Sequence, residues 1–129
     1  MKIVDVKFNK FNLGNRPEPW HDATFTESAL SFPLTQVITD EGLIGYAPCG
    51  NSKELIEGPL KEMVVGEDPI YMERIWNKLY SGWCHPASSG WEIRALSAID
   101  IALWDLNGKI LNQPVYKLLG GDRDRVPAY

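Results

Sequence analysis

The chain has 129 residues, of which 44% are hydrophobic, and this length and composition suit one domain with a single core. Thirteen basic and seventeen acidic residues give a net charge of -4, which excludes a basic surface for nucleic acid or an anionic membrane. The first ten residues mix charged and apolar side chains, unlike a signal peptide, and no apolar run reaches the length of about 18 residues expected of a membrane helix. We therefore expect a cytoplasmic protein.

The two cysteines, Cys49 and Cys84, form no CxxC pair and have no spacing typical of metal ligands. Reduced thiols are the prediction for such a chain, with a disulfide as the alternative.

Three strands are predicted in the first third of the chain. Apolar and polar residues alternate from Ile3 to Leu13, and a second extended run covers Phe32 to Thr39. The turn sequence Asp40-Glu41-Gly42 connects this run to a third one at residues 43–47. The pattern predicts a three-stranded antiparallel meander.

A long segment, Gly14 to Ser31, separates the first two predicted strands. It is too long and too rich in glycine, proline and polar residues for a tight turn. We predict a loop here and regard it as a candidate lid over a ligand.

Helices are predicted after Gly50. Ser52 can cap a helix that runs to Val64, although Gly58-Pro59 should kink or divide it. Asp68-Pro69 has the order expected at the start of a second helix.

The longest predicted helix begins at a capping box, Ser89-Gly90-Trp91-Glu92, and runs to about Leu111. Asn112 and Pro114 end it, a short helix closed by glycine follows in residues 114–121, and the last residues are extended.

The helix of residues 91–111 has apolar side chains on two sides. One broad arc contains Ala95, Leu96, Ala98, Ile99, Ala102, Leu103, Leu106 and Ile110, and a second stripe contains Ile93, Trp104 and Leu111. Such a helix needs cover on both sides, so we expect it to pack against a further layer.

Two acids on this helix, Asp100 and Asp105, lie about 140° apart around its axis, which prevents them from converging on one substrate or metal. They are not predicted to form a catalytic pair. Lys109 follows Asp105 by one turn, and this spacing predicts an ion pair that stabilises the helix.

The run ALSAIDIALWDLNGK from Ala95 to Lys109, followed by PVYKLLG from Pro114 to Gly120, resembles the signature of the mandelate racemase and muconate lactonizing enzyme group of the enolase superfamily. The segment VVGEDPIYMERIWNKLY resembles the second-helix segment of its N-terminal capping domain. The resemblance implies an α+β fold, a three-stranded antiparallel meander followed by a helical bundle, which normally caps a modified TIM barrel that this chain lacks. It also implies that residues 1–121 form the capping domain, and that residues 122–129 begin the truncated connection into the first barrel strand.

The resemblance implies an Mg²⁺-dependent parent enzyme that abstracts the proton α to a carboxylate. Dehydration of a sugar acid is favoured, before racemisation or epimerisation and then cycloisomerisation. The metal ligands and acid/base groups of that group lie on the barrel, so no catalytic residue and no metal ligand is expected in this chain. The expected partners are a small carboxylate substrate, a C-terminal TIM-barrel domain and further copies in a homo-oligomer. A self-contained, non-catalytic interaction module that docks a partner through the two-sided helix is the alternative from another class.

Two loops of the capping domain close over the substrate in that family, and they correspond to Gly14 to Ser31 and Pro48 to Ser52. In the first loop, Trp20 is a candidate apolar wall and His21 a candidate donor or proton relay. In the second, Cys49 and Asn51 are candidate substrate contacts. The plainer alternatives are a solvated loop histidine and a small packed cysteine.

Other notable side chains have structural interpretations. His85 is predicted to be a turn residue. The tryptophans Trp76, Trp83, Trp91 and Trp104 are interpreted as helix packing and interface residues, with a platform for stacking sugars as the minority alternative.

Overall fold

A computed structural model describes residues 1–83, 90–123 and 125–128 of the chain. Its sheet contains β1 (Ile3–His21), β2 (Thr26–Thr39) and β3 (Ile44–Ala47), which pair antiparallel in the order β1-β2-β3. The turn between β2 and β3 is closed by a hydrogen bond from the Gly42 amide to the Thr39 carbonyl. The predicted meander is confirmed.

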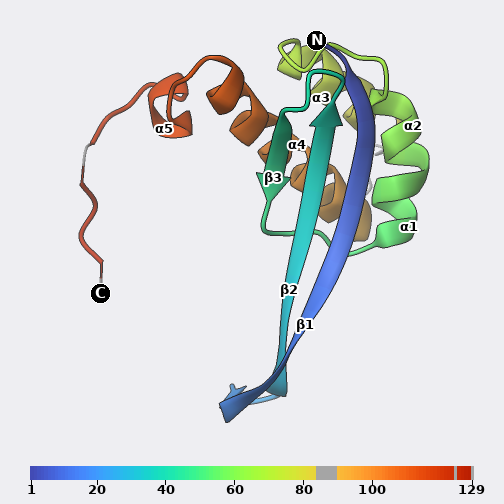
Figure 1. Ribbon diagram of the computed structural model, residues 1–129. Coiled ribbons are helices and arrows are strands. Elements are labelled where there is room, and N and C mark those ends of the chain that lie inside the picture. Colours follow the sequence, from blue (N-terminus) through green and yellow to red (C-terminus); the bar gives the residue numbers. More distant parts are fainter. Residues whose placement is uncertain (84–89, 124, 129) are drawn as a thin grey trace.

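The helices follow the sheet in the chain and cover one of its faces, as Figure 1 shows. The described helical elements are α1 (Lys53–Leu55), the π-helical segment η1 (Ile56–Leu60), α2 (Lys61–Val64), α3 (Met72–Gly82), α4 (Trp91–Ile110) and α5 (Val115–Leu118). Helix α4 packs against β2 and β3, whereas α5 lies beyond the end of α4, away from the sheet. The α+β architecture expected from the sequence is confirmed.

The core lies between the sheet and α4. All members of the predicted apolar arc of α4 are buried except Ile110, which is half-buried. β3 approaches the helix closely at Gly45, where an added Cβ would lie 2.7 Å from Leu106 Cβ and closer still to the Ala102 carbonyl oxygen. Any side chain at this position would therefore push β3 off the helix.

The second apolar stripe of α4 is only partly covered. Ile93 and Trp104 are half-buried, but Leu111 lies just past the helix end and is 51% exposed. Ile101, which was in neither predicted set, is 45% exposed. Within the described residues, Ile101 and Leu111 are thus left largely uncovered, whereas Trp104 lies beside Met72 and Trp76 of α3.

Two predicted helix boundaries have different outcomes. Ser52 Oγ accepts a hydrogen bond from the Leu55 amide, and the helix is divided at Gly58, whose dihedral angles are not helical, as predicted. The start predicted at Asp68-Pro69 is wrong, because Asp68 Oδ1 instead accepts from the Ile70 amide and forms a turn before α3. This turn is held by the buried Asn107, whose Nδ2 donates to the Pro69 carbonyl.

The remaining predictions for helix ends also have clear outcomes. The predicted short helix after Pro114 is α5, and α4 ends within one residue of the prediction. Of the predicted capping box, Ser89 lies outside the described residues, and Gly90 occupies the N-cap of α4.

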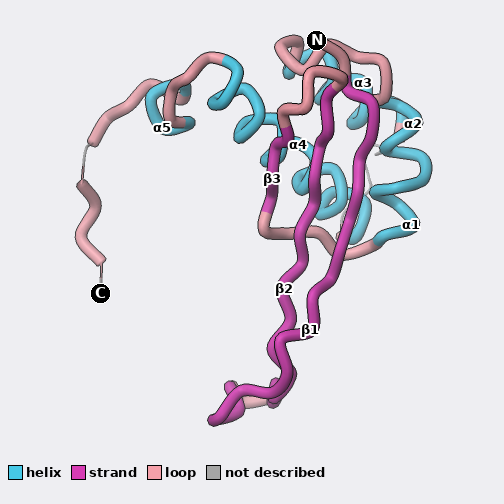
Figure 2. The backbone as a smooth tube through the Cα atoms, viewed as in Figure 1, coloured by secondary structure: helices cyan, strands magenta, loops and turns pink. Residues whose placement is uncertain are grey.

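The loop predicted at residues 14–31 is wrong, since this segment is a β-hairpin. β1 continues to His21 and β2 starts at Thr26, so both strands extend well beyond the rest of the sheet (Figure 2). The pairing tolerates the glycine and prolines because its register shifts between Asn12 and Asn15 and again between Asn15 and Trp20. We call residues 9–31 the extended hairpin.

The tip of the extended hairpin is held by Asp22. Its Oδ1 accepts hydrogen bonds from the amides of Thr24 and Phe25, at 2.8 and 2.9 Å. This is the local geometry that aspartate favours in turns. The bonds hold the carboxylate form and keep the pKa of Asp22 below its ordinary value, with the Thr24 amide as the largest cause.

Candidate functional site

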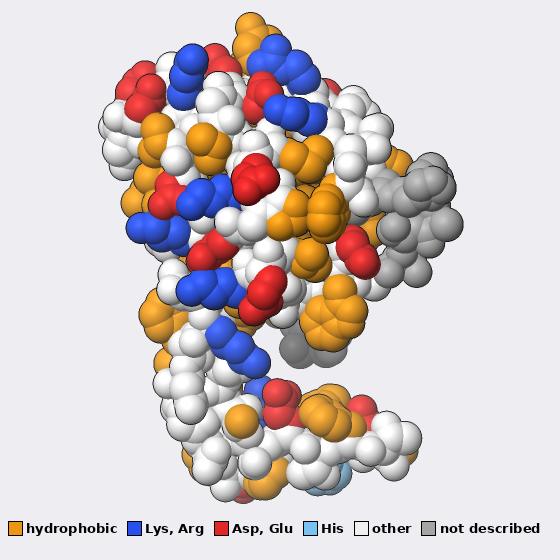
Figure 3. Space-filling model, turned by 90° about the vertical axis from the view of Figure 1, so that its right-hand side faces the viewer, with side chains coloured by type: hydrophobic (Ala, Val, Ile, Leu, Met, Phe, Trp, Pro, Cys, Tyr) orange, Lys and Arg blue, Asp and Glu red, His pale blue; other side chains and the backbone are white. Residues whose placement is uncertain are grey.

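A pocket of about 650 Å³ lies where the extended hairpin, the loop after β3 and the start of α4 meet. The hairpin bends beneath the body of the domain and leaves open space between the two (Figure 3). The residues that line the pocket are Phe8, Lys10, Phe25, Glu27, Ser31, Pro33, Gly50, Asn51, Trp91 and Arg94. Its volume is within the range typical of small-molecule sites.

The loop after β3 is fixed in place by contacts with the sheet. Thr35 Oγ1 donates a 2.8 Å hydrogen bond to the Cys49 carbonyl. Gly50, with φ of +135°, packs so closely on the Phe8 ring that an added Cβ would lie 2.5 Å from it. The loop therefore presents its backbone and the Asn51 side chain at a defined place beside the pocket.

Asn51 connects this loop to α4. Its Nδ2 donates to the Trp91 carbonyl at 3.0 Å, and that bond fixes the orientation of the amide. Its Oδ1 is buried and has no hydrogen-bond partner among the described residues. Leaving a buried acceptor without a donor costs free energy.

Three charged side chains line the same pocket: Lys10 and Glu27 from the two strands of the extended hairpin and Arg94 from α4. None of them takes part in an ion pair with another described residue. The Arg94 guanidinium carbon lies 5.7 Å from the Trp91 ring centroid, within the range of a cation–π contact. None of these three residues is a candidate on sequence grounds, where the one signal is that Arg94 is a charged residue outside the apolar arc, near the start of the helix.

Asn51 and Cys49, two of the predicted substrate contacts, lie beside one another in the fold. Asn51 lines the large pocket, and Cys49 lines an adjoining pocket of about 340 Å³ that also includes Arg94. Burial raises the pKa of the Cys49 thiol, which keeps it protonated and unsuited to act as a nucleophile. The thiol is suited to packing, and substrate contact by either residue stays a prediction.

Trp20 and His21, the other two predicted contacts, lie near the tip of the extended hairpin. Trp20 is 50% exposed and its ring centroid lies 6.4 Å from that of Phe25, while His21 is exposed and pairs with Thr26 across the strands. Neither residue lines the large pocket. The structure thus brings Phe25, but not Trp20 or His21, to the pocket wall.

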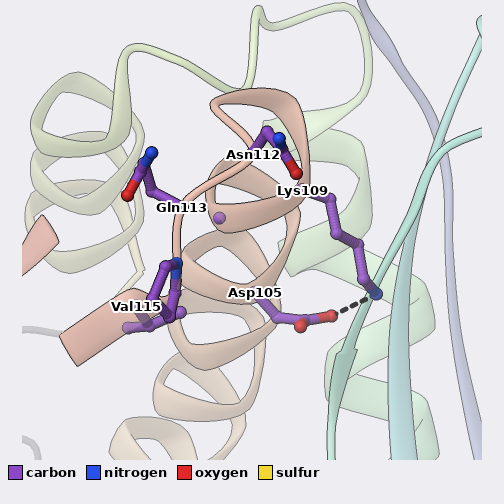
Figure 4. Close-up of a pocket in the computed structure, with 7 residues that line it drawn as sticks. Asp105, Lys109, Asn112, Gln113 and Val115 are labelled. Atoms are coloured by element: carbon purple, nitrogen blue, oxygen red, sulfur yellow. Dashed lines mark hydrogen bonds and ion pairs between the residues drawn. The ribbon is translucent and has the colours of Figure 1, made fainter. Parts of the chain in front are cut away.

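The acids of α4 have separate surroundings. Asp105 Oδ2 accepts from Lys109 Nζ at 2.6 Å and from the Tyr46 amide at 2.8 Å, and Lys109 also donates to the Ile44 carbonyl. Figure 4 shows the ion pair at one side of a shallow hollow beside α5. The predicted ion pair is confirmed, and it also satisfies backbone groups on the outer edge of β3.

Asp100 lies in another hollow, with Glu73, Trp76 and Trp104. Burial and then the charge of Glu73 raise the pKa of Asp100. The surroundings of Asp100 and Asp105 thus agree with the prediction that they do not act as a pair.

The tryptophans do not form a single cluster. Trp76 stacks on Tyr80 with centroids 4.7 Å apart, whereas Trp83 and Trp91 are 40% and 60% exposed. His85 and Cys84 lie outside the described residues.

The described residues contain neither a cluster of metal-ligand side chains nor a helix suited to span a membrane. No set of three or more His, Cys, Asp or Glu side chains is arranged to hold a metal ion. Within the same ranges, none of the helices combines the length and apolarity that crossing a membrane requires.

Comparison with known proteins extends these findings. The N-terminal domain of the mandelate racemase / muconate lactonizing enzyme family matches residues 5–120. Arabinonate dehydratase from Saccharolobus solfataricus is 34% identical over 80% of this chain and 29% of its own length. D-galactarolactone cycloisomerase from Agrobacterium fabrum is 31% identical over 100% of this chain and 35% of its own.

A solved structure of an enolase superfamily member from Polaromonas sp. JS666 has a TM-score of 0.84 and 28% identity, and the match covers 100% of this chain and 36% of that one. The chain therefore spans about a third of the length of the relatives it matches. It belongs to the mandelate racemase / muconate lactonizing enzyme family of the enolase superfamily and has the fold of that family's N-terminal domain.

Proposed function

We propose that this chain is the substrate-capping domain of an enolase-superfamily enzyme that removes the proton α to a carboxylate, with dehydration of a sugar acid as the reaction. The observation that carries the proposal is the large pocket, because the two segments expected to close over a substrate lie on either side of it. A relative named as a sugar-acid dehydratase supports this choice of reaction. Racemisation or epimerisation and cycloisomerisation are the alternatives within the family, and the last has a named relative.

The composition of the pocket wall suits a polyhydroxylated acid. Aromatic rings of Phe8, Phe25 and Trp91 provide apolar faces, while Ser31 and Asn51 provide hydrogen-bonding groups. An extended hairpin that lies across such a pocket can exclude water from a bound substrate.

The described residues of this chain do not fit an Mg²⁺ site, since none of their carboxylates gather into a ligand set. We therefore assign the metal ligands and the acid/base groups of the parent enzyme to a C-terminal TIM-barrel domain. In this proposal residues 1–121 form the capping domain and residues 122–129 begin the connection to the barrel. The enzyme is proposed to be a cytoplasmic homo-oligomer.

One observation favours a second candidate, a non-catalytic module that docks a partner protein. Ile101 and Leu111 are exposed on or just beyond α4. In the capping-domain proposal the same residues face the barrel, so the two candidates differ in whether a catalytic domain follows.

The test uses the full-length protein that contains this domain, incubated in D₂O with Mg²⁺ and a panel of aldonates and aldarates. We expect deuterium exchange at the α-carbon and loss of water from at least one substrate, while the 129-residue chain alone is inactive. Absence of both exchange and turnover across the panel would contradict the proposed function. Turnover by the 129-residue chain itself would contradict the assignment of catalysis to the barrel.

A further inference from the structure

The large pocket contains two cations without a described ionic partner. Lys10 reaches it from β1 and Arg94 from α4, and no described ion pair or side-chain hydrogen bond includes either residue. The neighbouring segment 84–89, CHPASS, carries no acid that could neutralise Arg94. Elsewhere on the domain, Lys61, Arg74, Lys78 and Lys109 each pair with a carboxylate. Lys2, Arg16, Lys117 and Arg125 also take part in no described ion pair, so what distinguishes Lys10 and Arg94 is that both line the same pocket.

Arg94 is the charged side chain that the two pockets beside the loop after β3 share. It lines the large pocket together with Asn51 and the adjoining pocket together with Cys49. The Trp91 ring holds one side of the guanidinium. The planar donors of an arginine held in this way suit a carboxylate or a phosphate.

The proposed reaction requires a carboxylate at the reacting end of the substrate, and the described residues of this chain offer no metal site to hold that end. The end of the substrate that enters the pocket of this domain is then the opposite one. We infer that Arg94, assisted by Lys10, binds a second anionic group of the ligand, a carboxylate or phosphate at the end remote from the reacting carbon. This inference rests on the proposed function and assigns a substrate class, dianionic sugar acids, to the same site.

Glu27 lies in the same pocket and opposes this preference. Its carboxylate repels a dianion, but it can accept hydrogen bonds from the substrate hydroxyl groups between the two ends. Removal of the Glu27 charge should therefore strengthen dianion binding while removal of the Arg94 charge weakens it. These opposite signs would not arise if both residues acted only in folding.

The experiment measures binding to the full-length protein by titration calorimetry. The probes are galactonate with one carboxylate, galactarate with two, and gluconate phosphorylated at its terminal hydroxyl. Arg94→Gln should weaken binding of the preferred dianion by about tenfold or more and leave galactonate affinity within about threefold. Glu27→Gln should strengthen dianion binding by about threefold. Arg74→Gln, which removes a guanidinium paired with Glu67 outside both pockets, is the matched control and should change neither.

Loss confined to galactarate identifies the second group as a carboxylate, loss confined to the phosphorylated probe identifies it as a phosphate, and either result supports the inference. An unchanged ratio of dianion to monoanion affinity in Arg94→Gln overturns it, even if the enzyme catalyses α-deuterium exchange. Dianion binding that depends on Arg94 without any exchange would support the site while contradicting the proposed reaction.

Discussion

β1 and β2 pass through two regions of different physical character. In the body of the domain, Val6 and Val37 are fully buried against the core, whereas every residue from 9 to 26 is exposed. The extended hairpin is thus held by its own register and by the Asp22 turn, and two-stranded ribbons of this kind have little stability of their own. Most of the stability of the fold therefore comes from the body, whereas the side chains of the hairpin from residue 9 to residue 26 are exposed to solvent.

Equivalent leucine truncations should show the largest difference between the two regions. Leu103 is 1% exposed in α4, and Leu13 is 57% exposed in the hairpin. Leu103→Ala should lower the free energy of unfolding by about 3 kcal/mol, and Leu13→Ala by less than about 0.5 kcal/mol. Urea unfolding of the 129-residue chain measures both. Equal losses of unfolding free energy would show that Leu13 of the hairpin is packed against other residues in solution.

Replacement of glycine by alanine compares the backbone of the body with that of the extended hairpin. Gly45→Ala places a Cβ against the backbone of α4 and should cost on the order of 2–3 kcal/mol. Gly14→Ala has open space around it but requires a positive φ, so its cost should be about 1 kcal/mol. Thermal unfolding provides the ranking, and a Gly45→Ala variant as stable as the parent would mean that β3 can move away from α4.

The secondary structure of the body could be predicted from the sequence because the residue patterns that determine it are local. The arc of α4 follows from helical periodicity alone, and the turn at Gly42 and the cap at Ser52 each depend on a few adjacent residues. The Asp68-Pro69 prediction failed because a distant residue, Asn107, stabilises a turn there.

The hairpin and the pocket could not be predicted in the same way. Glycine and prolines in residues 14–31 are typical of loops, and only the pairing of strands through shifted register makes them a ribbon. The pocket joins Lys10, Asn51 and Arg94, which are far apart in sequence and meet only through the packing of β1, the loop after β3 and α4. The residue pattern within a single segment therefore gives no indication that these three side chains line one pocket.

The tip of the hairpin is the next point of comparison. In the full-length protein, Trp20→Ala and His21→Ala should raise KM or shift substrate preference by about threefold to tenfold, because each would remove the substrate contact that we propose for the hairpin tip. The melting temperature should change little, since both side chains are exposed. Steady-state kinetics on the sugar-acid panel measure the effect. If both variants match the parent on every substrate, the tip has no part in selection.

The ion pair at the edge of β3 should have a smaller effect, confined to stability. A double-mutant cycle of Asp105→Asn and Lys109→Gln should give a coupling of about 0.5 kcal/mol, because both side chains are 37% exposed and solvent screens them. High salt should reduce this coupling further. The value of kcat in the full-length protein should not change. Loss of turnover in a folded Asp105→Asn variant would instead indicate a role in catalysis.

The smallest expected effect concerns two aspartates, Asp100 and Asp22, whose pKa values are shifted in opposite directions. Burial, then the charge of Glu73, raises the pKa of Asp100 above its ordinary value of 3.8, so its protonated form favours the folded state. That stabilisation is fully present below pH 3.8 and is lost as pH rises through the folded-state pKa of Asp100. Asp100→Asn should therefore stabilise the domain at neutral pH by about 0.5 kcal/mol or less, and the gain should vanish in acid.

Asp22 should behave in the opposite way, because its lowered pKa gives stability that is present above 3.8 and lost as pH falls through its folded-state pKa. A carboxyl NMR titration of the 129-residue chain should find Asp100 titrating above 3.8 and Asp22 below it. Asp100 titrating below 3.8 in the isolated chain would contradict its burial beside Glu73. The same titration in the full-length protein tests whether another part of the polypeptide contacts Asp100. A cation that docks in the hollow of Trp76 and Trp104 would lower the pKa of Asp100 and leave the pKa of Asp22 unchanged.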